Sequence, residues 1–160
     1  WLMPNKYKPI LWLVVFSMFS ACQSIPSEKN ESKYLGSVLV KNTQSQLKSN
    51  VVVYENASGI IIQLIKPIVG KIGDIKIGSK GSRAEFVNSD LSFAQDFEKS
   101  LQADKGLIME TLRKCLSTGY LNRSFQEMYI VCSKNSENIL TIRFQIMNGF
   151  SGEFILKKGK

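Results

Sequence analysis

Hydrophobic segments rich in Val, Ile and Tyr recur along the chain beyond Tyr34 and are separated by polar breaks, which is the pattern of β-strands. The clearest alternation runs from Ile139 to Met147. The breaks between such segments hold Asn, Gly and Ser, which suit hairpin turns. We therefore expect sequential antiparallel strands at 34–41, 49–55, 59–65, 70–78, 82–88, 126–133, 139–147 and 152–157.

The hydrophobic period lengthens to that of amphipathic helices in the middle of the chain. Asp90 or Ser92 is expected to cap a first helix. The apolar stripe of this helix comprises Phe93, Phe97 and Leu101. A second helix is expected after 104–106 and should end at Gly119. Its apolar stripe comprises Ile108, Leu112, Cys115 and Leu116.

A meander, a helical segment and a returning meander indicate a mainly β (α+β) domain. We expect a curved antiparallel sheet that forms a half-open β-barrel, with the inserted helices lidding its concave face. The strands at 51–53 and 60–65 are apolar on both faces. Two explanations stay open: a cavity that holds a lipid or acyl chain, or a sheet that protein covers on both sides.

The N-terminal segment has the three parts of a secretory signal. Lys6 and Lys8 precede an apolar run at 9–19, and small residues follow it. The run is shorter than the roughly 20 residues that a spanning helix needs. Phe19-Ser20-Ala21-Cys22 resembles the bacterial lipobox, so residues 1–21 are expected to be a signal peptide and Cys22 the lipidated residue. The alternative is an ordinary secreted protein with an incidental cysteine.

Residues 22–33 are polar and contain a proline, which predicts a flexible tether. Residues 34–160 then form one domain, long enough for a single core. Gln23 follows the cysteine where inner-membrane lipoproteins of enterobacteria commonly carry Asp. The lipobox resemblance therefore implies an outer-membrane lipoprotein whose domain faces the periplasm.

The chain is basic, with a formal charge of +8 at pH 7. On a membrane-tethered domain this charge favours acidic partners or anionic lipid surfaces. Nucleic acid is disfavoured, because the protein is predicted to be exported and no basic run is interleaved with stacking aromatics.

Cys115 and Cys132 are the two other cysteines of the chain. One lies on the apolar stripe of the second helix and the other alternates with Met128 and Ile130, so both are expected to face one core. The periplasm permits disulfides. A disulfide bridge and two buried free thiols both fit this pattern.

The composition argues against an enzyme. The chain contains no histidine, which removes the usual general base and the commonest metal ligand. Its carboxylates are scattered, and glycines such as Gly73 and Gly78 lie in strands or turns instead of opening a helix. We expect no catalytic residues, no metal and no cofactor.

A family resemblance lies in residues 34–86. A strand begins Tyr34-Leu35-Gly36, and the apolar strand from Ile60 to Ile65 leads through Lys66 into the loop Pro67-Ile68-Val69-Gly70. This order resembles the LolB family of outer-membrane lipoprotein receptors, in which alternating hydrophobics lead into a Pro-Leu-Gly loop. The resemblance covers roughly the first half of the mature domain. Ile68 stands at the family's leucine, and Val69 is added before Gly70.

The resemblance implies a function. A LolB-like domain accepts lipoprotein acyl chains from the periplasmic carrier LolA and inserts them into the outer membrane. Pro67, Ile68, Val69 and Gly70 would then form the membrane-insertion loop. The alternative is a non-catalytic structural or partner-binding lipoprotein whose β domain holds no ligand.

The residues of the loop support its exposure independently. Pro67 cannot donate a central-strand hydrogen bond, so Ile68 and Val69 should sit in a turn. They either touch a membrane there, or Ile68 folds back to plug the barrel mouth. Lys66 and Lys71 flank the tip and suit an anionic lipid surface.

Overall fold

The computed structural model describes residues 31–79, 81–87, 105–125, 128–147 and 149–160. Within these ranges the chain forms strands and a helix, α3 (Lys105–Thr118). The strands are β1 (Ser32–Lys41), β2 (Gln46–Asn56), β3 (Gly59–Lys66), β4 (Gly70–Gly78), β5 (Gly81–Phe86), β6 (Leu121–Ser124), β7 (Met128–Lys134), β8 (Ile139–Ile146) and β9 (Phe150–Lys158).

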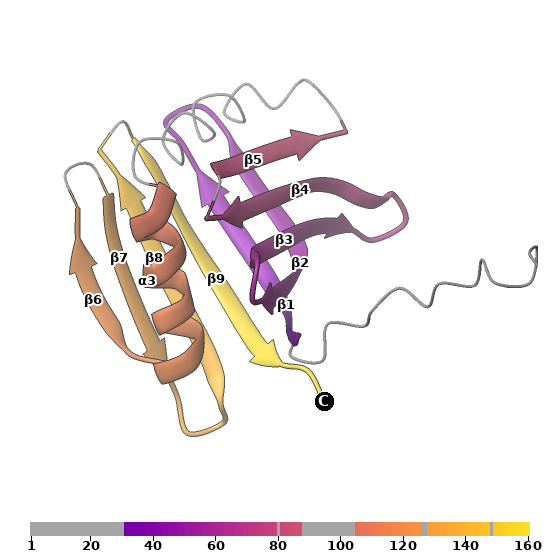
Figure 1. Ribbon diagram of the computed structural model, residues 1–160. Helices are drawn as coiled ribbons and strands as arrows, with labels where there is room; N and C mark the ends of the chain where they lie inside the picture. The colour runs from indigo at the N-terminus through magenta and orange to yellow at the C-terminus, as the bar shows by residue number, and fades with distance from the viewer. Residues whose placement is uncertain (1–30, 80, 88–104, 126–127, 148) are drawn as a thin grey trace, which may run out of the picture.

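All nine strands belong to one antiparallel sheet in the order β5-β4-β3-β2-β1-β9-β8-β7-β6. Two meanders, β1 to β5 and β6 to β9, are joined where β9 pairs with β1. The sheet twists so strongly that β3, β4 and β5 run across the direction of β8 and β9 (Figure 1). It does not close, because β5 and β6 are its two edges. The expected mainly β, antiparallel fold is confirmed.

The predicted strands agree with the observed ones to within a few residues, except that β6 was not predicted. This strand has only four residues and a single buried apolar one, Leu121, so no alternation marks it. β9 begins at Phe150, before the predicted start at residue 152. The predicted first helix, with Asp90, Ser92 and its apolar stripe, lies outside the described residues.

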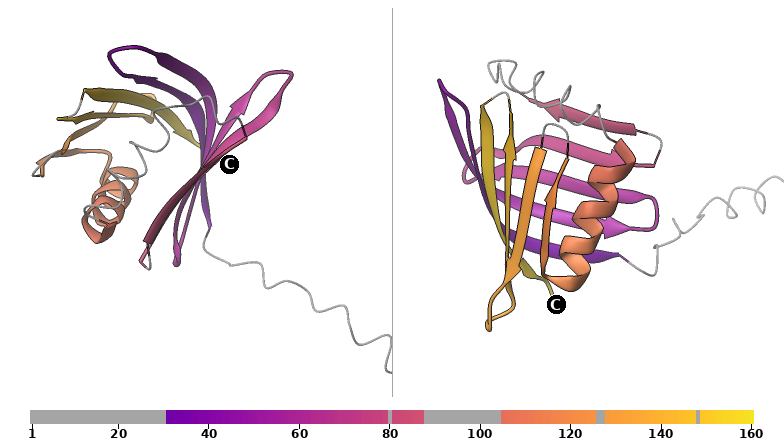
Figure 2. Two further views of the ribbon diagram at one scale, coloured as in Figure 1. Left: turned by 90° about the horizontal axis from the view of Figure 1, so that it is seen from above. Right: turned by 90° about the vertical axis from the view of Figure 1, so that its left-hand side faces the viewer.

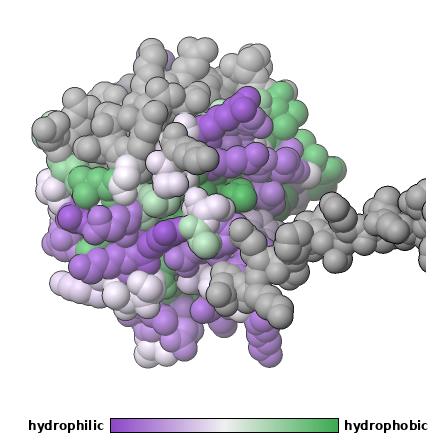
Figure 3. All heavy atoms as spheres, viewed as in Figure 1, coloured by the Kyte–Doolittle hydropathy of each residue, from purple (hydrophilic) through white to green (hydrophobic). Residues whose placement is uncertain are grey.

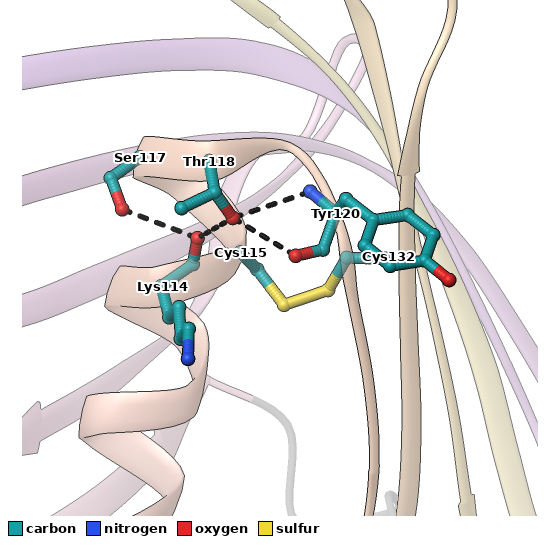
Figure 4. Close-up of a disulfide and its surroundings, with 6 residues drawn as sticks. All are labelled: Lys114, Cys115, Ser117, Thr118, Tyr120 and Cys132. Carbon is teal, nitrogen blue, oxygen red and sulfur yellow. Dashed lines mark hydrogen bonds between the residues drawn. A yellow bond between two sulfur atoms is a disulfide. The ribbon is translucent and has the colours of Figure 1, made fainter.

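The second predicted helix is confirmed as α3. Of its predicted apolar stripe, Ile108, Cys115 and Leu116 are buried and Leu112 is partly buried. Gly119 ends the helix with a φ of +71°, and its N–H donates to the Cys115 carbonyl at 2.9 Å. The Thr118 hydroxyl lies 2.7 Å from the Lys114 carbonyl oxygen (Figure 4). It also accepts from the Tyr120 N–H, just before β6, at 3.3 Å.

The core lies on one face of the sheet, and α3 packs on that face (Figure 2). The inward residues of the strands alternate along β1 and β2, as Val38 and Val51 illustrate with about 1% exposure each. Tyr34 reaches from β1 toward the end of α3, where its hydroxyl lies 3.4 Å from the Leu116 carbonyl oxygen. Burial, together with the charge of Glu55, raises the pKa of Tyr34 above its ordinary value.

A disulfide joins Cys115 of α3 to Cys132 of β7, so the bridged alternative is confirmed (Figure 4). The two Cα atoms lie 5.7 Å apart, and both residues are fully buried. The bridge fixes the helix to the C-terminal meander across a sequence separation of 17 residues.

Replacing both cysteines, as Cys115→Ala with Cys132→Ala, is expected to lower the free energy of unfolding by about 3 kcal/mol, because a loop of this length then gains entropy in the unfolded chain. Urea denaturation measures the change. Reductant should lower the stability of the parent by a similar amount and leave the double variant unaffected. Equal stability of the parent with and without reductant would contradict the structural role.

Candidate functional site

The turn between β3 and β4 carries Ile68, the most exposed large hydrophobic side chain among the described residues. Lys66 pairs with Gly70 at the base of the hairpin, and Pro67, Ile68 and Val69 form its tip. Ile68 is 107% exposed and Val69 is 70% exposed. Ile68 therefore points into solvent and does not fold back against the sheet.

The backbone at the tip is unfavourable for the residue that occupies it. Ile68 has a φ of +75°, which matches the second central position of a type II turn after proline. Glycine or asparagine normally takes that position, and a β-branched residue there is an outlier. The strain costs on the order of 1–2 kcal/mol. Ile68 is thus unfavourable both in its backbone and in its exposure.

Hydrophobic residues also gather beside the tip. Figure 3 shows apolar surface over the β3–β4 turn and the end of β5. Val87 follows β5, is 71% exposed and donates its N–H to the Ile72 carbonyl at 2.9 Å, which holds it next to β4. Lys66 is exposed, whereas Lys71 forms a 2.7 Å ion pair with Asp74. The two predicted flanking lysines therefore differ in charge compensation. Lys71 is paired with a carboxylate, whereas Lys66 forms no ion pair with a described residue.

The interior between the sheet and α3 is nearly filled. Two hollows lined only by apolar residues measure about 40 and 20 Å³. Both are lined by Ile62, Leu112, Ile142 and Phe154. A cavity for an acyl chain needs several hundred cubic ångströms. Neither of these two hollows is large enough to hold an acyl chain.

Two of the contacts that hold α3 lie on opposite sides of the helix. The disulfide attaches it to β7. On the opposite side, the Arg113 guanidinium donates to the carbonyl oxygens of Asn56 at 2.7 Å and Ala57 at 3.0 Å in the β2–β3 turn. Asn56 itself fixes this turn, because its side-chain oxygen accepts from the Ser58 and Gly59 N–H groups. No local pattern of residues predicts the Arg113 contact, which depends on long-range packing.

Two larger hollows are open and partly polar. One, of about 540 Å³, lies over β7, β8, β9 and β1 and includes Tyr129 and Arg143. The other, of about 800 Å³, includes Lys134, Glu137 and Lys158. Among the described residues no cluster of His, Cys, Asp or Glu could hold a metal ion, and no helix has the length and hydropathy to cross a bilayer.

Several predicted features lie outside the described residues. These are the signal peptide at 1–21, the lipidated Cys22 and most of the tether at 22–33. The structure therefore places the loop and the two bridged cysteines, but it does not test the anchor. No protein-family model matches the chain, and no curated protein matches it either. The resemblance to the LolB family stays a prediction.

Replacing the strained tip residue should stabilise the fold. Ile68→Gly is expected to raise the free energy of unfolding by about 1 kcal/mol, because glycine adopts a positive φ without steric cost and Ile68 contributes no burial. Gly70→Ala is the opposite control, since Gly70 has a φ of +84°. Urea denaturation measures both. A destabilised Ile68→Gly variant would mean that the side chain packs against the domain.

Proposed function

We propose that this chain is an outer-membrane lipoprotein that accepts acyl chains of lipoproteins from a LolA-like periplasmic carrier and inserts them into the outer membrane. Cys22 would anchor it by its lipid, and the domain would face the periplasm. The sheet would act as a half-open barrel, with α3 and the preceding segment as its lid. Acyl chains, the carrier and outer-membrane lipid are the partners of this function.

The tip formed by Pro67, Ile68 and Val69 is the observation that carries the proposal. A β-branched side chain that is fully exposed and holds a positive φ lowers stability twice over. Such a cost is expected where function needs it. Insertion into lipid removes the exposed hydrophobic surface from water. The free energy gained in the membrane then offsets the stability that the exposed tip costs in solution.

The packed interior favours a second candidate, a structural or partner-binding lipoprotein with a ligand-free β domain. Hollows as small as 40 and 20 Å³ are those expected of a core packed to ordinary density. On this reading the tip still contacts membrane, but no acyl chain is carried. The two candidates differ in whether the domain transfers acylated protein between a carrier and vesicles.

The anchor is tested by Cys22→Ala, which removes the thiol that would be acylated. We expect the variant to lose all incorporation of a clickable fatty acid and to remain as uncleaved precursor or soluble protein. Cys115→Ala with Cys132→Ala is the matched control and should label like the parent. Equal labelling of the Cys22→Ala chain would show that the lipobox assignment is wrong.

The tip is tested by Ile68→Glu in a transfer assay from carrier to vesicles. A carboxylate in a solvated turn costs the fold little, yet inserting it into a bilayer costs about 2 kcal/mol or more, so the transfer rate should fall by roughly tenfold or more. Thermal melting and cargo acceptance should stay near the parental values.

Tyr120→Glu is the control, because Tyr120 is 74% exposed and lies after α3, away from the tip. It should transfer at the parental rate. A folded Ile68→Glu chain that also transfers at that rate would remove the tip from the mechanism. Absence of transfer by the parent itself would favour the ligand-free lipoprotein.

A further inference from the structure

The outer face of the sheet, opposite α3, is apolar at its centre. Figures 1 and 2 show α3 on the other side of the sheet. Outward residues of β1, β2, β3 and β9 form what we call the outer patch: Leu35, Val52, Tyr54, Ile61 and Ile155. Leu35 is 46% exposed and Ile155 is 42% exposed.

The strand register makes the outer patch continuous. Leu35 lies opposite Val52, and Tyr54 lies opposite Ile61. Ile155 is the diagonal neighbour of Leu35, since its direct partner is Ser37. An antiparallel sheet with one face on the core normally has a polar outer face. A contiguous apolar surface here therefore indicates a contact with something outside the domain.

Lysines surround the outer patch. Lys157 is paired with Leu35, Lys33 with Tyr54 and Lys76 with Ile61. The Lys33 ammonium also lies 5.7 Å from the centre of the Tyr54 ring.

The acidic side chains on the same face are already compensated. Asp74 forms an ion pair with Lys71, Glu85 with Arg83 and Glu153 with Arg143. No carboxylate of the described residues pairs with the three lysines around the patch. The outer patch thus combines exposed hydrophobic residues with net positive charge, which is the chemistry that an anionic lipid surface complements.

The outer patch also lies next to the predicted anchor. β1 begins at Ser32, ten residues after Cys22, and Leu35 is among its first outward residues. Ten extended residues span at most about 35 Å. A lipid on Cys22 would therefore keep this face close to the bilayer, and the tether would turn a weak contact into an intramolecular one. On β3 the outward face continues through Ile65 to the tip.

We propose that the outer patch docks the domain on an anionic bilayer, with α3 facing the aqueous side. This inference rests on the lipid anchor of the proposed function. It adds a resting orientation in which the tip lies at the membrane while the α3 side stays open to an incoming carrier. Docking is electrostatic in part, so it should weaken as salt rises.

The experiment uses the lack of tryptophan between Cys22 and Lys160. The two tryptophans, Trp1 and Trp12, both lie in the predicted signal peptide. Ile155→Trp therefore places a single fluorophore on the outer patch of the lipidated protein. Vesicles of phosphatidylcholine with about a third phosphatidylglycerol, with or without brominated acyl chains, report its depth. Ser117→Trp, on the exposed end of α3, is the matched control.

Brominated lipid should quench the Ile155→Trp chain several-fold more than the Ser117→Trp chain. The difference should shrink when ionic strength rises from about 0.1 M to about 1 M, which shortens the Debye length from roughly 10 Å to 3 Å. Lys33→Gln with Lys157→Gln should also reduce it, whereas Lys114→Gln on α3 should not. Leu35→Trp provides a second probe if Ile155→Trp perturbs the sheet.

Equal quenching of the patch and control probes would overturn the docking. Equal quenching together with concentration-dependent dimerisation of the protein would assign the outer patch to a second copy instead. The proposed function fails differently, through the transfer assay. Quenching at the patch without any transfer would support the docking and reject the receptor function. Full transfer without quenching at the patch would support the receptor function and reject the docking.

Discussion

The pairing of β1 with β9 joins the two meanders, and it is the only ladder among the described strands that does so. It runs from Tyr34 opposite Lys158 to Lys41 opposite Ser151, so it pairs the first described strand with the last. Near its middle, a Cβ on Gly36 would collide with the carbonyl oxygen of Ile155. Glycine there allows the close backbone approach that a strongly bent sheet needs.

The bend brings both meanders within reach of one helix. α3 contacts β4 and β5 on one side and β6 on the other, and it is bonded to β7 through the disulfide. If an acyl chain enters, the Arg113 hydrogen bonds to the β2–β3 turn can break reversibly, whereas the disulfide stays intact. The interior would therefore widen on the side of β3 and β4, whose outer turn carries Ile68.

Local patterns determined what the sequence could reveal. Hydrophobic alternation located β8, and Gly119 marked the end of α3. The β3–β4 hairpin was located by an apolar strand that ends at Pro67. The sequence could not reveal contacts that depend on distant segments. Pairing of β9 with β1 and the Arg113 contact both join segments far apart in the sequence. For Cys115 and Cys132 the sequence left a bridge and two free thiols open, and only the packing of α3 on the sheet decides between them. β6 was missed because it is held by its neighbour β7 and by little burial of its own.

The candidate site lies where folding alone would favour other residues. Turn chemistry favours glycine at the position of Ile68, and a solvated outer face favours polar residues at Leu35 and Ile155. In a sequence selected only for stability, turn residues, strand patterns and core packing all favour the same fold. Residues that break one of these local rules tend to lie at functional sites. Both departures add exposed apolar surface beside lysines, at the tip near Lys66 and on the outer patch. Because the outward face of β3 runs through Ile65 to the tip, the proposed anionic bilayer would account for both departures.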